Sequence, residues 1–213
     1  NINKTQSIEN NILSIERKRK KFMNKRTINI ISKMTICAML LALGWVLPFL
    51  TGQIPQFGNM FLPMHLPVLI GGFVLGPWYG LFLGIVTPLT RSLLFTMPPI
   101  YPTATSMAFE LAAYGFASGL LFKLAYKMFN GNDKKLIISI YVVLIIALIF
   151  GRLVYGLTMF VLTFITPDKV NLNGMIYISA TILNAWPGII LQIVLIPAII
   201  IALYKAKLLN RYF

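Results

Sequence analysis

Four ionisable side chains in apolar sequence are the first candidates for chemistry in this chain. Arg91, Glu110 and the only histidine, His65, lie between residues 64 and 115, and Arg152 lies in a later apolar run. An ionisable group in membrane hydrocarbon costs at least ~2.5 kcal/mol, so such groups usually have a partner and a function. A guanidinium can bind a carboxylate through two parallel hydrogen bonds. Two arginines against one glutamate leave one positive charge in excess, which favours a small anionic ligand.

Each of these four side chains also has a structural interpretation. Arg91 and Glu110 can form an ion pair between two helices. Arg152 can extend toward the membrane surface or bond backbone carbonyls. His65 lies between Met64 and Leu66, where a packed and hydrogen-bonded histidine is common.

Three uncharged residues complete the set of candidate site residues. Asn184 can contact a ligand or hold helices together. Tyr101 and Trp186 can line a pocket or belong to the aromatic belt at the membrane surface.

Enzyme chemistry has little support. The sequence has one histidine, no second carboxylate near Glu110, and no HExxH, GxSxG or phosphate-loop pattern. The single cysteine, Cys37, lies in an apolar run and is expected to be a small buried hydrophobe. We therefore expect no catalytic residue, no metal site, no cofactor and no direct use of ATP.

The composition is that of a membrane protein. Hydrophobic residues make up 58% of the 213 residues, and charged residues only 11%, against roughly 25% in ordinary soluble domains. A span needs ~20 apolar residues. The sequence predicts an all-α integral membrane protein, a bundle of six transmembrane helices. The predicted spans are 30–50, 63–75, 78–96, 104–128, 136–165 and 175–204, the last interrupted at 186–188.

This pattern divides the chain into a basic leader (1–29), a membrane domain (30–205) and a short tail (206–213). Sixteen of the 19 Lys and Arg residues fall on one side of a six-span arrangement. Positive charge collects on the cytoplasmic side, so both termini are expected there, in a multi-pass protein of the cell membrane. The leader does not resemble a cleavable signal peptide. We expect it to contact anionic lipid headgroups rather than nucleic acid.

Three segments resemble a known family: MHLPVLIGGFVLGPWYG, TPLTRSLLFTMPP and MAFELAAYG. They look like the substrate-binding S-components of energy-coupling factor (ECF) vitamin transporters, and most like the pantothenate type. The resemblance covers roughly residues 28–205. It implies six helices, a vitamin pocket near the outer face, and a partner module of one transmembrane coupling subunit and two ATPases. It also implies a docking motif of two alanines four residues apart, which Ala38 and Ala42 match.

Under this resemblance each candidate receives a role toward a vitamin such as pantothenate. Arg91 and Arg152 would bind its carboxylate, and Glu110 would orient an arginine or accept a ligand hydroxyl. His65 and Asn184 would hydrogen-bond the amide and hydroxyls, while Tyr101 and Trp186 would pack its apolar body. The alternatives are a pyridoxine- or cobalamin-type S-component, a stand-alone secondary carrier with Glu110 as coupling group, or a membrane scaffold. A scaffold would have a tight Arg91–Glu110 pair and no cavity beside it.

Overall fold

The computed structural model describes residues 23, 27–49, 62–129, 132–165, 185–206 and 208–209. The chain forms two compact units, Asn1–Ile36 and Cys37–Phe213. The helix Thr27–Phe49 runs through their boundary, so its two parts are described separately. In the first unit, the hydroxyl of Thr35 donates to the carbonyl of Ile31 at 3.0 Å, within the helix.

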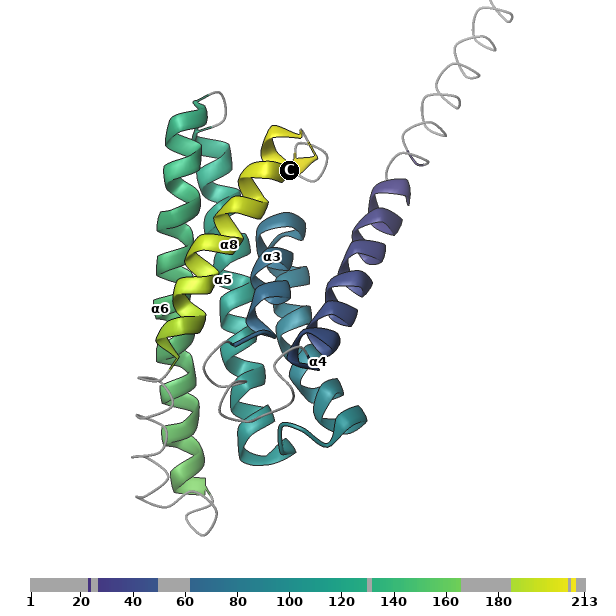
Figure 1. Cartoon of the computed structure of the whole chain (residues 1–213), viewed down its shortest axis with the longest axis vertical. Helices are drawn as coiled ribbons and strands as arrows, with labels where there is room; N and C mark the ends of the chain where they lie inside the picture. The colour runs from purple at the N-terminus through teal and green to yellow at the C-terminus, as the bar shows by residue number, and fades with distance from the viewer. Residues whose placement is uncertain are drawn as a thin grey trace, which may run out of the picture. The chain divides into compact units, whose positions relative to one another are not determined.

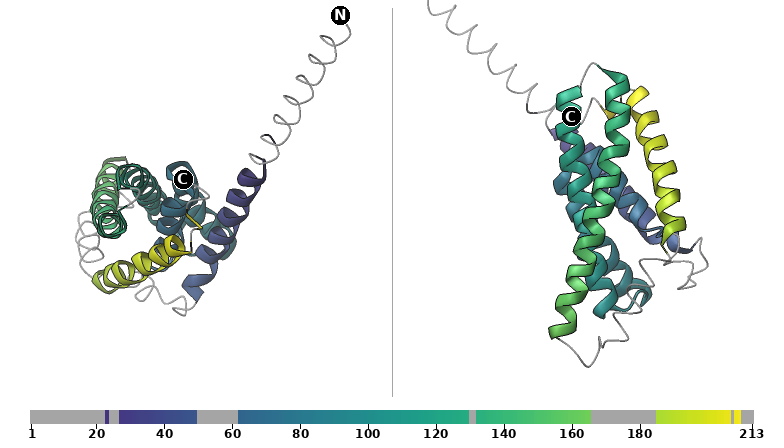
Figure 2. Two further views of the ribbon diagram at one scale, coloured as in Figure 1. Left: turned by 90° about the horizontal axis from the view of Figure 1, so that it is seen from above. Right: turned by 90° about the vertical axis from the view of Figure 1, so that its left-hand side faces the viewer.

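The second unit is built of helices wherever the structure describes it. After residues 37–49 come α3 (His65–Leu75), α4 (Pro77–Phe95), the irregular segment η1 (Ile100–Ala104), α5 (Thr105–Phe129), α6 (Asp133–Ile165) and α8 (Trp186–Lys205). The long helices α5 and α6 run side by side, and α8 is inclined to α6 (Figures 1 and 2). The all-helical prediction is confirmed.

The number of membrane-crossing helices differs from the prediction. Among the described residues, five helices are long and apolar enough to cross a membrane, and α3 is a shorter apolar helix of 11 residues. At ~1.5 Å per residue, α3 is roughly half as long as the ~30 Å hydrocarbon layer is thick. The predicted start of the last span at 175 lies outside the described residues; its described part, α8, begins at Trp186.

Glycines let α3, α4 and α5 approach closely. Gly76 adopts φ 98° between α3 and α4, a conformation that suits glycine, and Pro77 then occupies the first position of α4. A Cβ on Gly80 of α4 would meet the backbone of Gly115 of α5, and the reverse also holds. The two backbones therefore touch directly. This packing makes α5 the central helix, in contact with α3, α4 and α6, and α5 carries the glutamate.

Candidate functional site

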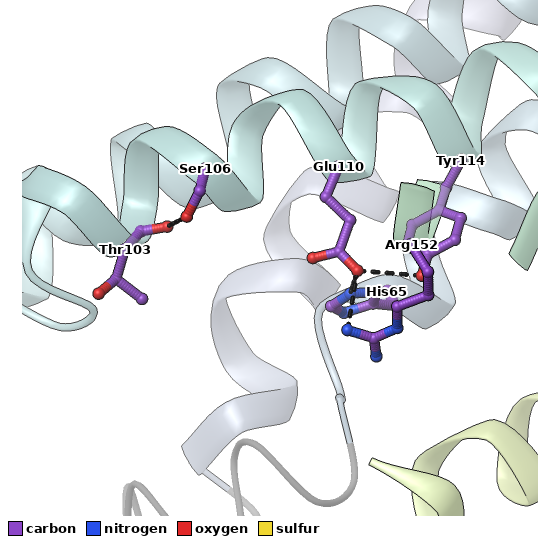
Figure 3. A network of polar contacts seen from close by, with 6 residues as sticks. All are labelled: His65, Thr103, Ser106, Glu110, Tyr114 and Arg152. Carbon is purple, nitrogen blue, oxygen red and sulfur yellow. Dashed lines mark hydrogen bonds and ion pairs between the residues drawn. The ribbon is translucent and has the colours of Figure 1, made fainter. Parts of the chain in front are cut away.

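The carboxylate of Glu110 is the centre of a buried polar network (Figure 3). Glu110 is only 2% exposed, and its Oε1 lies 3.0 Å from Nη1 of Arg152. The hydroxyl of Tyr114 donates to the same oxygen at 3.0 Å. Nε2 of His65 lies 3.6 Å away, beyond good hydrogen-bond length. Three helices thus bring a carboxylate, a guanidinium, a phenol and an imidazole together.

Local sequence explains why these side chains meet. Tyr114 follows Glu110 by four residues on α5, so the two lie on one helix face. The ring of Tyr114 packs edge-on against His65, the first residue of α3, with centroids 5.3 Å apart. Its other neighbour is Gly151 of α6, where a Cβ would meet the tyrosine ring. Gly151 therefore makes room for the tyrosine one residue before Arg152.

The network leaves strong hydrogen-bond donors unused. Among the described residues, the buried side-chain polar atoms without a hydrogen-bond partner belong to His65, Arg152 and Gln192. In Arg152 these atoms are Nε and Nη2. Their N–H bonds point in parallel from one edge of the guanidinium, which is the geometry that takes a carboxylate in a bidentate manner. Nη1 holds Glu110 on the other side.

A cavity of about 550 Å³ adjoins Arg152. Its walls come from α5, α6 and α8 and are mostly aliphatic. The lining residues are Tyr114, Ile145, Leu148, Ile149, Arg152, Leu153, Gly156, Ile189 and Ile193. Pockets of this size, apolar with a few placed polar groups, are typical of small-molecule sites.

The structure places Arg91 away from this network. Its Nη1 donates to the carbonyl of Trp45 at 2.5 Å. Its guanidinium carbon lies 5.1 Å from the ring centroid of Phe49 and 5.4 Å from that of Phe95. Among the described residues Arg91 has no carboxylate partner, since Glu110 pairs with Arg152. The Arg91–Glu110 pair considered from the sequence does not form.

The remaining candidates are scattered. Tyr101, in η1, packs against a small core cluster on α6, and Trp186 is 61% exposed at the start of α8. Neither lines the cavity. Asn184 lies outside the described residues. Ala38 and Ala42 are both exposed on the helix Thr27–Phe49.

Two polar side chains of this region were not among the predicted site residues. Tyr114 has a detectable signal, because it stands four residues after the only glutamate in apolar sequence. Gln192 is a single amide in the apolar run of α8, and it is fully buried in the structure. A single polar amide in an apolar run was the sequence feature that could have identified Gln192.

Comparison with known proteins identifies the family. Residues 32–200 match the family described as ECF transporter, substrate-specific component. No curated protein and no solved structure gives a significant match. The matched segment covers most of the chain and includes Glu110, Arg152 and every described wall of the cavity. This chain is a membrane protein that belongs to the family of ECF transporter substrate-specific components.

Proposed function

We propose that this subunit binds a small water-soluble vitamin bearing a carboxylate, with pantothenate as the leading candidate. The observation that carries the proposal is the free edge of Arg152, where Nε and Nη2 are buried without partners. A buried donor left unpaired in the folded protein lowers its stability. A ligand carboxylate on this edge would satisfy both donors at once.

The hydrogen-bonding groups around the Glu110–Arg152 pair support an anionic ligand. Glu110 already faces Arg152 at 3.0 Å, so that pair is neutral before a ligand enters. An added carboxylate brings one negative charge, and His65 lies beside the pair with both ring nitrogens unpartnered. Arg91 has its donor on a backbone carbonyl, so the geometry favours Arg152 over Arg91 as the carboxylate partner.

The cavity supports a ligand with an apolar body. Its aliphatic walls on α6 and α8 suit methyl and methylene groups, whose burial contributes roughly 25 cal/mol per Å². Pantothenate combines a carboxylate with such a body. Tyr101 and Trp186 would then act at the rim rather than in the cavity, and Asn184 remains a proposed ligand contact.

As a substrate-specific component, the subunit works with an ECF module. We propose that the module consists of one transmembrane coupling subunit and two ATPases. The exposed pair Ala38 and Ala42 supports docking on this helix, because small residues four apart let a partner helix approach. We also propose that both termini are cytoplasmic and that the basic leader contacts lipid headgroups.

The test is a ligand panel on the purified, detergent-solubilised subunit, measured by calorimetry and thermal shift. Pantothenate is compared with pantothenol, its matched analogue with an alcohol in place of the carboxylate. A ligand at about 100 times its Kd stabilises a protein by ~2.7 kcal/mol. Stabilisation by pantothenate but not pantothenol is the expected result.

Other outcomes separate the alternatives. A shift only with pyridoxine or cobalamin would keep the transporter subunit and overturn the carboxylate argument. No shift with any vitamin would favour a secondary carrier or a scaffold. The scaffold has less support, because Glu110 pairs with Arg152 rather than Arg91 and a cavity adjoins the pair.

A further inference from the structure

Gln192 of α8 is a fully buried amide without a hydrogen-bond partner among the described residues. Its exposed fraction is 0%, and both Nε2 and Oε1 lack partners. Folded proteins rarely bury an amide in this state, because the lost hydrogen bonds to water are not replaced. An unpaired amide of this kind indicates either strain or a ligand.

The position of Gln192 favours a ligand. It follows Ile189 by three residues and precedes Ile193 by one, and both isoleucines line the cavity. Residues three and four apart share a helix face. Gln192 is not itself a lining residue; it lies beside the cavity wall, on the buried stripe that α8 forms with Gly188 and Ile196.

The other unpartnered groups among the described residues lie on helices that neighbour α8. Arg152 belongs to α6 and lines the cavity, and His65 belongs to α3, near Glu110 and in contact with the cavity-lining Tyr114. Helix α8 packs against both α3 and α6. Unused hydrogen-bonding groups are thus found on α8 and on both of these neighbours.

Arg152 and Gln192 differ in the hydrogen bonds they can make, and therefore in the ligand groups they can recognise. Arg152 offers donors only, which suits an anion, whereas a glutamine offers two donors and an acceptor. The natural complement of a glutamine amide is another amide or a ureido group, whose N–H can donate to Oε1 or whose C=O can accept from Nε2. An apolar side chain at 192 would pack as well and cost no desolvation.

We propose that Gln192 is a specificity-determining residue that hydrogen-bonds an amide group of the ligand. This rests on the proposed function, and it narrows the substrate class to carboxylic acids that also carry an amide or ureido group. Arg152 selects the acid, and Gln192 rejects acids of similar size that lack the amide. A site that buries its own polar groups discriminates strongly against such analogues, because they leave those groups unpaired.

The experiment compares wild type, Gln192→Met and the control Ile190→Met in calorimetry and in thermal unfolding without ligand. Methionine keeps the length and removes the amide; Ile190 is exposed on the same helix. The probes are pantothenate and biotin, which carry a carboxylate with an N–H and C=O group, and nicotinate, which has a carboxylate but no N–H donor.

We expect Gln192→Met to weaken binding of the amide- or ureido-bearing acid about 10- to 100-fold and to change nicotinate binding less than three-fold. Its thermal midpoint without ligand should stay the same or rise, because an unpaired buried amide is replaced by an apolar group. Ile190→Met should resemble wild type in both measurements.

Four results would overturn the inference, and they have different consequences. Unchanged affinity in Gln192→Met, or a wild type that binds nicotinate but neither amide- nor ureido-bearing acid, removes Gln192 from recognition and leaves the carboxylate proposal intact. A clearly lowered thermal midpoint in Gln192→Met would assign the amide a structural partner. A wild type that binds none of the three acids would overturn the proposed function together with this inference.

Discussion

The two arginines in the membrane, Arg91 and Arg152, have the same charge and opposite surroundings. Arg91 is 3% exposed and lies beside two phenylalanine rings that pack edge-on against each other, with one donor on the carbonyl of Trp45. Arg152 is 15% exposed, pairs with Glu110, lines a cavity, and has two buried donors without partners among the described residues. One guanidinium joins helices, and the other pairs with a carboxylate beside a cavity.

The partners explain how Arg91 remains buried without a carboxylate. Trp45 lies near the C-terminal end of the helix Thr27–Phe49, where the helix dipole is negative. The faces of Phe49 and Phe95 add cation–π attraction. Trp45 is held in turn, since its Nε1 donates to Thr90 of α4 at 2.9 Å. Arg91 therefore links α4 to residues 37–49, whereas the contact that holds Arg152 within the described part of the chain is made by Nη1.

The largest expected effect comes from Arg152→Gln. This change leaves the Glu110 carboxylate buried without its cation, which typically costs ~3–5 kcal/mol. We expect a strongly lowered thermal midpoint and no measurable binding of the proposed ligand, pantothenate. Thermal unfolding and calorimetry on the purified protein measure the two effects.

The double variant Glu110→Gln with Arg152→Gln separates folding from binding. It removes both charges, so most of the lost stability should return while binding stays absent. Recovery of binding in the double variant would contradict the role of Arg152 as carboxylate partner.

A smaller effect, of a different kind, is expected from Arg91→Met. It removes a charged hydrogen bond and two cation–π contacts, together about 2–3 kcal/mol of unfolding free energy. Ligand affinity should stay within three-fold of wild type, because no contact of Arg91 reaches the cavity. Loss of binding without loss of stability would return Arg91 to the site, as the charge count alone suggests.

The sequence predicted the helices well and the pairing of the charges poorly, for physical reasons. Hydropathy and proline positions predicted the bounds of α3, α4 and α5, and the end of α6, to within about three residues of the observed bounds. Which arginine reaches the glutamate depends on how α4 and α6 are rotated against α5. Glycines of α4 meet the backbone of α5, and Gly151 of α6 meets the ring of Tyr114, and spacing along the chain does not reveal these contacts.

Two buried residues that the sequence did not single out are Gly151 and Gln192. Gly151 has no chemistry of its own, yet its missing Cβ determines where the Tyr114 ring lies. Gln192 is one polar residue in an apolar helix, and it barely changes the mean hydropathy from which the span was predicted. The contact of Gly151 and the burial of Gln192 both depend on how helices pack, which spacing along the chain does not reveal.

The smallest of these effects is expected from Gly151→Ala, which acts on the Arg152 site through packing alone. The added methyl group would collide with the ring of Tyr114 and shift the hydroxyl that donates to Glu110. Overpacking of this kind costs ~1–3 kcal/mol, offset by up to ~1 kcal/mol of better helix propensity. We expect net destabilisation of about 1 kcal/mol in thermal unfolding and several-fold weaker binding.

Gly156→Ala is the matched control for stability in the same helix, because a Cβ there meets nothing within 4 Å. Gly156 lines the cavity, so ligand binding is not compared between the two variants. It should raise stability by up to ~1 kcal/mol through helix propensity. Opposite signs for the two glycines would show that Tyr114 positions the acid that holds Arg152. Equal stabilisation by both alanines would mean that the tyrosine moves without cost, and that the network depends on the Glu110–Arg152 pair alone.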